Sequence, residues 1–500
     1  MFGVFFGKTM AKWEACSIGL FDGIKCETHG PVLSHFMYAD DVIFIGEWSS
    51  RNALNLNRIL RCFYLVSGLR VNLSKSSIYG VGVDEGEVHA MASILRCKIG
   101  SFPFKHLGLQ VGANMNLVKN WKPVVDIFKK RLSVWKASTL SYGGRITLIK
   151  SVLSALPTYY FSLYKAPMKV IKQLERLRKD FLWGSDPEHE KMSWVAWQRI
   201  MAPIELGGVG IWSLKEANTA LLAKWWWRFK VDGPCLWRNV IWNLHSSSRN
   251  WCDIPVRLSA PGIWKQVAGI SKDLLDVGVD LPGLIRGIPG DGLNILFWKD
   301  HWVMDKPLQF FCPNLFRLEK LKNSPVASRV RVVDGITILN FEWTREPGSA
   351  EELLELEGLM AVMGDVYFGS GRDMWEWKAD QSGTYSVRSL RLKMQLANYP
   401  DREGGFIWDS WAPIKVKFLS WCVFLNRIPT MVELQKRNIN TGSLLCRICG
   451  NHDETTDHLF VSCDLAQGVW DYVSRWCRIP SVYAFEFKDL VKLHHHMRGS

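Results

Sequence analysis

The sequence predicts an α+β protein in which a short β-hairpin with its helices precedes a helical region and a small metal-binding module. Three observations predict this class. Apolar runs flank a tight turn at residues 38–41, apolar residues recur at helical spacing from Trp121 to Trp183, and cysteines gather with a histidine between residues 446 and 463. Because 48% of the residues are hydrophobic, each of about three domains can form a core.

The net charge indicates the kind of partner. The 500 residues include 62 Lys and Arg against 48 Asp and Glu, which gives a net charge of +14. Residues 101–200 hold 17 basic and 6 acidic side chains, so the excess is local. A solvated basic surface would have the same composition, but so local an excess favours a polyanion, and nucleic acid is the expected partner.

The compartment is predicted from apolar runs and cysteines. No apolar run reaches the length of a membrane span, and the N-terminal MFGVFFGKTMAKW lacks a leading basic region and a small-residue cleavage site. Most of the 12 cysteines are scattered without regular spacing, as core thiols are. We therefore expect an intracellular protein, with the nucleus as its compartment and no membrane partner. The oligomeric state stays open.

The hairpin carries the first candidate site. A loop over residues 21–29 leads to a predicted strand over 32–38, and the returning strand is predicted over 42–45, so that YADD forms the turn. Its adjacent carboxylates, Asp40 and Asp41, could hold Mg²⁺ or Mn²⁺ as the metal-binding turn of a polymerase does. Asp is also common in turns because its side chain hydrogen-bonds locally, so the turn alone leaves both interpretations open.

The segment after the turn favours the metal-binding interpretation of the two carboxylates. A helix is predicted over residues 52–66, packed on the hairpin, and FYLVSGLRVNLSKSSIYGVG follows over residues 63–82. Together with YADD, this segment resembles the reverse transcriptases of plant non-LTR (LINE-type) retrotransposons. The resemblance implies part of a polymerase palm, in which Asp40 and Asp41 bind the catalytic metal ions and Lys75 acts near the phosphates of the incoming nucleotide. A solvated loop lysine is the alternative for Lys75.

A second short segment resembles the same family. FKHLGLQVG, Phe104 to Gly112, is similar to the strand pair where the family places its primer grip. His106 stands where the family usually has Tyr. We expect a pair of short strands here.

Three amphipathic helices are predicted after Trp121. The first has its apolar face at Trp121, Val124, Val125, Phe128, Leu132 and Trp135. The second runs from Arg145 to Leu156, after Gly143 and Gly144. The third runs from Lys169 to Trp183, and its buried residues are expected to be Ile171, Leu174, Leu177 and Phe181. Basic residues expected outside are Lys122, Lys129, Lys130, Arg131, Lys136, Lys172, Arg176, Arg178 and Lys179. The resemblance implies a thumb that binds the phosphates of an RNA and DNA template-primer duplex. Helices that only solubilise a bundle would look similar.

Three consecutive tryptophans, Trp225 to Trp227, lie in the segment that follows. They could stack on bases, but three neighbours on a helix face several directions. Core packing is therefore the favoured interpretation.

The C-terminal cysteines predict a zinc site. Cys446, Cys449, His458 and Cys463 form the pattern C-x2-C-x8-H-x4-C, which can complete a tetrahedron around Zn²⁺ with no position left for water. The site should therefore be structural. Four core residues would be the alternative. A run of three histidines at residues 494–496 is more typical of a solvated tail.

The flanks of these ligands resemble a known domain. WEWKADQSGTYSVRSL, over residues 375–390, and IWDSWAPIKVKFLSWCVFLNRIPT, over residues 407–430, are similar to the reverse-transcriptase zinc-binding domain of plant retroelements. We therefore expect five segments: a partial reverse-transcriptase palm over 1–115, a thumb-like basic helical region over 116–235, a connector over 236–371, the zinc-binding domain over 372–475 and a tail over 476–500.

The resemblance implies a truncated RNA-directed DNA polymerase whose ancestor used a two-metal mechanism. A palm requires a further carboxylate on a strand before the hairpin, and Asp22 is the only Asp ahead of the turn. Its setting, LFDGIK, does not resemble such a strand, so we expect no polymerisation by this chain alone. The alternative is a non-catalytic, zinc-containing nucleic-acid-binding or interaction protein derived from a retroelement.

Overall fold

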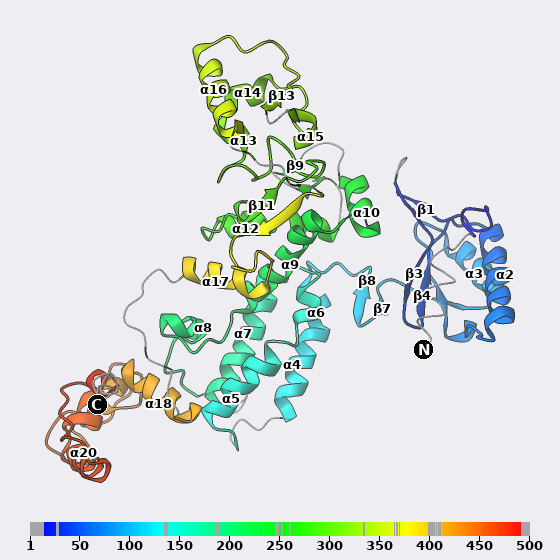
Figure 1. Cartoon of the computed structure of the whole chain (residues 1–500). Coiled ribbons are helices and arrows are strands. Elements are labelled where there is room, and N and C mark those ends of the chain that lie inside the picture. Colours follow the sequence, from blue (N-terminus) through cyan, green and yellow to red (C-terminus); the bar gives the residue numbers. More distant parts are fainter. Residues whose placement is uncertain are drawn as a thin grey trace. The chain divides into compact units, whose positions relative to one another are not determined.

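The computed structural model divides the chain into two compact units, one made of Met1–Asn120, Leu163–Lys165 and Leu222–Ser389, and the other of Trp121–Ser162, Ala166–Leu221 and Leu390–Ser500 (Figure 1). The structure describes residues 15–26, 30–134, 139–185, 191–233, 235–245, 250–251, 254–257, 259, 262–333, 336–364, 366, 369, 371–398, 406, 408 and 412–491. The five segments expected from the sequence stay a prediction, since each unit includes parts of several of them.

Short two-stranded sheets form the β-structure of the described residues. The pairs are β1 (Ile24–Lys25) with β2 (Val32–Leu33), β3 (His35–Tyr38) with β4 (Asp41–Phe44), β5 (Ser77–Ile78) with β6 (Lys98–Ile99), β7 (Phe104–His106) with β8 (Leu109–Val111), β9 (Asn250–Trp251) with β10 (Ile254–Pro255), β11 (Ile285–Ile288) with β14 (Met374–Trp377), and β12 (Val330–Val333) with β13 (Ile336–Leu339). These sheets stand among many helices, which is the predicted α+β class. Strand β1 lies in the stretch expected to be a loop.

The first unit also contains a series of helices, many of them short. They are α2 (Ser50–Ser67), α3 (Glu85–Leu95), α10 (Leu236–His245), α11 (Ile263–Ala268), α12 (Ile270–Leu275), α13 (Leu308–Phe311), α14 (Pro313–Leu318), α15 (Val326–Arg329) and α16 (Ala350–Gly364), together with the second half of α9 (Leu214–Val231). No described helix is both long and apolar enough to cross a membrane.

Helix α2 begins earlier than predicted because the Ser49 side chain caps it by accepting from the Asn52 N–H at 3.2 Å. Its inner side is polar. The Asn52 amide donates to the backbone carbonyls of Asp22 and Glu47, each at 2.9 Å, and so holds the chain before and after the hairpin. Leu54 and Leu65 of this helix are exposed.

The tryptophans of α9 are packed, as the core interpretation predicted. Trp226 is fully buried, and its indole N–H donates to the Val267 carbonyl at 2.8 Å. Trp225 lies edge-on to Trp237, with ring centres 5.3 Å apart. Side chains held in this way are not free to stack on bases.

The second unit contains the three predicted amphipathic helices and the C-terminal module. Its helices are α4 (Lys122–Val134), α5 (Tyr142–Leu148), α6 (Thr158–Phe161), α7 (Met168–Trp183), α8 (Trp197–Met201), α18 (Ile414–Phe424), α19 (Met431–Gln435) and α20 (Asp464–Cys477), with most of α17 (Val387–Asn398). Trp121, Val124 and Phe128 are buried, as their spacing predicts. Trp135, Lys136 and residues 494–496 lie outside the described residues.

The second helix differs from its prediction. Gly143 and Gly144 lie inside α5, which Ser141 caps, and the helix continues as a π-helical turn over Ile149–Leu153. A Cβ on Gly143 would lie 3.1 Å from the Lys415 backbone nitrogen of α18. The glycine is needed for this close approach, which no local pattern indicates.

Helices α17 and α18 are joined to the basic helical region of the same unit by buried polar contacts. The Trp421 indole donates to the Gly207 carbonyl at 2.8 Å, and the Gln395 amide donates to the Glu216 carboxylate at 3.0 Å. Burial raises the pKa of Glu216. These contacts anchor the leading helices of the C-terminal module.

Candidate functional site

The two predicted carboxylates lie at the tip of a regular hairpin. Strands β3 and β4 pair Tyr38 with Asp41, so Ala39 and Asp40 form a two-residue turn in which Ala39 has a φ of 53°. Both carboxylates are exposed, and neither has a hydrogen bond or ion pair to another described residue. The turn therefore presents two oxygen ligands to solvent.

Lys75 lies in a different local structure. It ends the 3₁₀ turn Leu73–Lys75, which Asn72 caps by accepting from the Lys75 N–H at 3.2 Å and from the Ser74 hydroxyl at 2.7 Å. The Lys75 side chain is exposed. Asn72 therefore has a structural role in the NLSK segment, and among the described residues no hydrogen bond or ion pair joins the Lys75 side chain to the hairpin turn.

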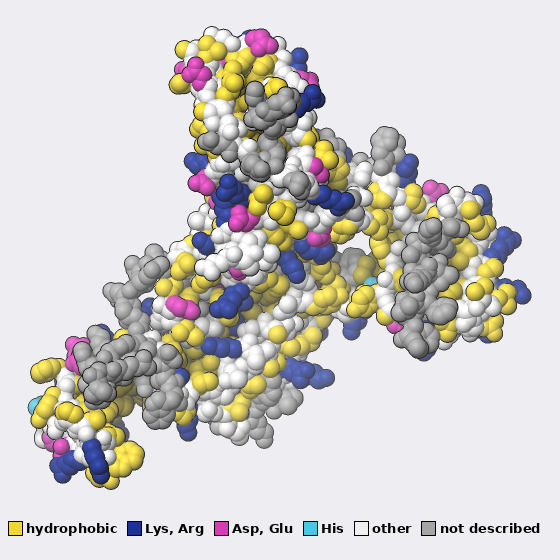
Figure 2. Space-filling view, in the orientation of Figure 1, with side chains coloured by type: hydrophobic (Ala, Val, Ile, Leu, Met, Phe, Trp, Pro, Cys, Tyr) yellow, Lys and Arg dark blue, Asp and Glu magenta, His cyan; other side chains and the backbone are white. Residues whose placement is uncertain are grey.

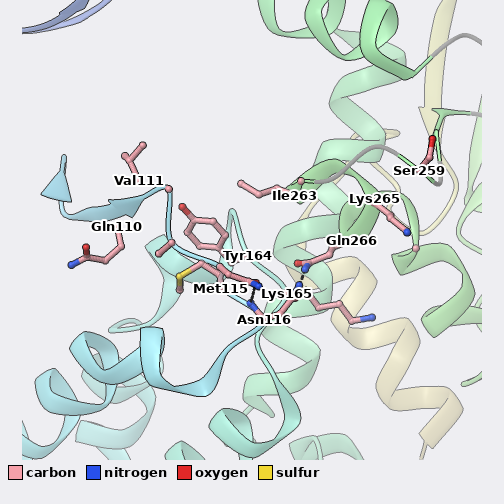
Figure 3. Close-up of a pocket in the computed structure, with 15 residues that line it drawn as sticks. Gln110, Val111, Met115, Asn116, Tyr164, Lys165, Ser259, Ile263, Lys265 and Gln266 are labelled. Carbon is pink, nitrogen blue, oxygen red and sulfur yellow. Dashed lines mark hydrogen bonds between the residues drawn. The ribbon is translucent and has the colours of Figure 1, made fainter. Parts of the chain in front are cut away.

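The predicted strand pair is present as β7 and β8, with Leu107 and Gly108 both at positive φ in the turn. A cavity of about 960 Å³ opens beside the end of β8 (Figure 3). Two of the lining residues, Gln266 and Asn116, are hydrogen-bonded to each other, and Lys165 pairs with Asp273 outside the lining. No residue predicted as catalytic or metal-binding lines this cavity.

The predicted basic residues lie mostly on the surface. On α4, Lys122, Lys129, Lys130 and Arg131 are exposed, and on α7, Lys172 and Arg176 are exposed while Lys179 is half-buried. Figure 2 shows Lys and Arg side chains on the surface over α4. These side chains are accessible to solvent and to other molecules.

Arg178 is the exception, and its predicted exposure is wrong. Its side chain is fully buried, pairs with Glu175 at 2.8 Å, and donates to the Trp212 carbonyl at 3.0 Å and the Ser154 hydroxyl at 3.0 Å. It follows Leu174 by four residues and so lies on the buried side of α7. Burial lowers the pKa of the guanidinium, and the Glu175 carboxylate offsets part of that effect.

The four predicted zinc ligands come together in the C-terminal module. Their ligand atoms all lie within 4.8 Å of one another, and the Cys449 sulfur is 3.2 Å from His458 Nε2. Ligands of one tetrahedral zinc ion stand about 3.5 Å apart, so this arrangement fits the ion. It is the one such group of three or more ligating side chains found in the described residues.

Local structure explains how the ligands meet. Cys446 and Cys449 lie on a tight turn in which the Cys446 N–H donates to the His452 carbonyl at 2.7 Å and Gly450 adopts a φ of 73°. His458 begins a π-helical turn whose end brings in Cys463, and its Nδ1 lies 3.4 Å from the Ser462 hydroxyl. That hydroxyl can orient the ring.

The electrostatic setting suits thiolate ligands. Backbone N–H groups, foremost that of Asn451, lower the pKa of the Cys449 thiol. Burial raises the pKa of the Cys463 thiol, since a lone thiolate there would be poorly solvated. A bound cation would remove that penalty, because thiolates bind zinc in their deprotonated form.

Comparison with known proteins agrees with this geometry. Residues 385–470 match the family described as zinc-binding in reverse transcriptase. The chain is 32% identical over 155 residues to "Uncharacterized mitochondrial protein AtMg00310" of Arabidopsis thaliana, covering 30% of this chain and 95% of that protein. It is 30% identical over 356 residues to "Putative ribonuclease H protein At1g65750" of the same plant, covering 69% of this chain and 54% of that protein.

The family match over residues 385–470, the two relatives and the ligand cluster together identify a reverse-transcriptase-like protein with a zinc-binding module. The chain belongs to a family of reverse-transcriptase-related proteins with members in Arabidopsis thaliana, as its sequence motifs indicated. It spans about half the length of the relative with which it shares the longer match.

Proposed function

We propose that this chain is the C-terminal part of a retroelement reverse transcriptase that binds template-primer duplex through its basic helices and contributes half of a two-metal site. The observation that carries this proposal is the open carboxylate turn, Asp40 and Asp41, in the same chain as the Cys₃His cluster. Two Mg²⁺ or Mn²⁺ ions would activate the primer 3′ hydroxyl and neutralise the leaving pyrophosphate.

The ligand set supports inactivity of this chain by itself. Two metal ions about 4 Å apart need more ligands than one turn offers. In the described residues no third carboxylate joins Asp40 and Asp41 in a metal-binding group. Exposed apolar residues on the hairpin and α2, among them Tyr38 and Leu65, fit a region that another polypeptide segment covers.

The duplex interaction rests on the surface lysines and arginines. Lys122, Lys129, Lys130 and Arg131 on α4 and Lys172, Arg176 and Lys179 on α7 would contact phosphates, which carry no sequence information. Binding should therefore weaken steeply with salt and vary little with sequence. Lys75 would meet nucleotide phosphates only after the missing ligands are supplied.

The zinc module has a structural role in this proposal. Cys446, Cys449, His458 and Cys463 would hold one Zn²⁺, which leaves no open position for catalysis. The ion supplies the folding energy of a small region with a thin core.

Primer extension on an RNA template with Mg²⁺ or Mn²⁺ tests the proposal. We expect salt-sensitive binding of an RNA–DNA duplex and no nucleotide incorporation. Incorporation that Asp40→Asn abolishes would overturn the claim of inactivity. Absence of any duplex binding would overturn the assigned role of the basic helices.

A second candidate function is a non-catalytic nucleic-acid-binding protein. The exposed basic side chains of α4, which need no metal to act, favour it. The two candidates differ in a mixing experiment. If a separately supplied upstream palm segment restores incorporation that depends on Asp40, the polymerase role holds, whereas binding alone under all conditions supports the second candidate.

A further inference from the structure

Helix α20 of the C-terminal module presents an unusual apolar stripe to solvent. Leu465, Val469, Tyr472 and Trp476 are 57%, 51%, 71% and 76% exposed. At 100° per residue they lie within about 60° of one another around the helix. Hydrophobic side chains are visible on the surface over α20 in Figure 2. A face of four large apolar side chains on so small a module is typical of an interaction surface.

The opposite side of α20 already has its partners. Ser474 is buried, and it accepts at its carbonyl from the Ile479 N–H at 3.0 Å and at its hydroxyl from the Val482 N–H at 3.3 Å. The Trp470 indole donates to the Phe460 carbonyl at 2.9 Å. The helix is therefore held to its module by one face, while the stripe is available to another molecule.

The spacing of the stripe specifies a helical partner. The four residues follow one another at intervals of four, three and four, which is the spacing of the a and d positions of a heptad. Such a seam packs best against a second helix whose side chains interdigitate with it.

The charges beside the stripe argue against nucleic acid. Arg475 pairs with Asp471 four residues before it, and Asp464 adds a further negative charge at the start of the helix. The flank therefore lacks the net positive charge that phosphate binding needs. Tyr472 and Trp476 could stack on bases, but Arg475 is paired with Asp471, and Asp464 balances Arg478 at the other end of the helix, so no net positive charge would hold the backbone.

We propose that this stripe pairs with the same stripe of a second copy of the chain, with the two α20 helices antiparallel. A two-fold axis between Val469 and Tyr472 places Leu465 opposite the second copy's Trp476, and Val469 opposite its Tyr472. Each layer then combines an aliphatic with an aromatic side chain. A parallel pair would instead put Trp476 against Trp476.

The charges at the two ends of α20 also select this orientation. Asp464 and Arg475 lie on the same flank, about 20° apart around the helix and 11 residues apart along it. In the antiparallel pair each Asp464 comes within two residues, about 3 Å along the axis, of the level of the other copy's Arg475. The two helices of 14 residues are short, so we expect a weak, reversible dimer.

Sedimentation velocity of the full zinc-loaded chain over a range of concentrations tests the pairing. We expect a monomer–dimer equilibrium, which Tyr472→Glu weakens at least tenfold while the zinc content stays at about one equivalent. Leu354→Glu is the matched control, because Leu354 on α16 is also 71% exposed but lies outside the stripe. Its dimerisation should equal that of the unmodified chain.

Charge reversal tests the orientation. Asp464→Arg and Arg475→Asp should each weaken the dimer, and the double variant should restore it to within about threefold. A monomer at every concentration, or a dimer that Tyr472→Glu leaves intact, would overturn the proposal. A chain that stays monomeric but loses single-stranded oligonucleotide binding in Tyr472→Glu would show that the stripe is a base-stacking surface, which also overturns it.

Discussion

The cysteine cluster of the C-terminal module and the carboxylate turn of the hairpin are two candidate metal sites that differ in how complete they are. The cluster gathers four ligands from 18 residues of chain, three of them buried, and provides a hydroxyl beside its histidine. The turn offers two adjacent carboxylates, both exposed and without a described partner. Side chains whose partners lie within this chain should therefore contribute mainly to folding stability. Exposed side chains without such partners should contribute mainly to the binding of other molecules.

Removing the zinc ion should have the largest effect. Structural zinc contributes about 10–16 kcal/mol in zinc-finger peptides, so Cys446→Ser should reduce the metal content from about one equivalent to nearly none and unfold the module. Metal analysis and limited proteolysis measure this. Cys477→Ser is the control, because Cys477 is exposed and belongs to no ligand group of the described residues. Full zinc content in Cys446→Ser would contradict the assignment of Cys446 as a zinc ligand, and with it the contrast between the two candidate metal sites.

Arg178, the buried arginine of α7, should likewise contribute to folding stability. Arg178→Met leaves Glu175 without its buried partner and should lower the free energy of unfolding by about 3–5 kcal/mol. Arg176→Met, two residues earlier on the same helix and mostly exposed, should change it by less than about 1 kcal/mol. Denaturant titration of both variants measures the difference. Equal losses in the two variants would mean that burial does not determine how much each arginine contributes to the free energy of unfolding.

The exposed cations of α4 should affect binding and not stability. Replacing Lys129, Lys130 and Arg131 by Gln should weaken duplex binding about tenfold or more, and should reduce the slope of log K against log salt by about 0.9 for each phosphate that the variant no longer neutralises. Fluorescence anisotropy at several salt concentrations measures this. A triple variant of Arg317, Lys320 and Lys322 in the connector removes the same charge and should bind nearly normally. Equal weakening in both variants would indicate a nonspecific charge effect.

The carboxylate turn should show the smallest effect on folding. Asp40→Asn combined with Asp41→Asn should change the free energy of unfolding by less than about 0.5 kcal/mol, because exposed side chains without partners contribute little. Zinc content should also stay unchanged. A decrease of several kcal/mol would show that the turn is a structural element and not an open ligand pair.

Local patterns predicted much of this molecule. The hairpin, helices α2, α4 and α7, and the group of four ligands follow from alternation, helical spacing and ligand order, which are properties of neighbouring residues. Arg178 shows where such patterns end, since a basic side chain on the edge of an apolar stripe was expected in solvent. Its burial depends on Glu175, Ser154 and the Trp212 carbonyl, which no spacing rule connects.

The remaining differences have the same origin. Gly143 was expected to open a helix, but it lies inside α5, where it leaves room for the backbone of α18, more than 250 residues later. Asn52 turns inward because it bonds the backbone of Asp22. Each depends on a contact distant in sequence. Of the two candidate metal sites, the Cys₃His cluster could be predicted from the sequence because its four ligands are close together in the chain.

The most direct test of the contrast is a Mn²⁺ titration of the zinc-loaded chain, followed by electron paramagnetic resonance. We predict one tightly held zinc ion and only weak Mn²⁺ binding that Asp40→Asn with Asp41→Asn leaves almost unchanged, since one turn cannot enclose the ion. Stoichiometric, tight Mn²⁺ binding that the double variant abolishes would contradict this prediction, because the turn would then be a complete site in this chain.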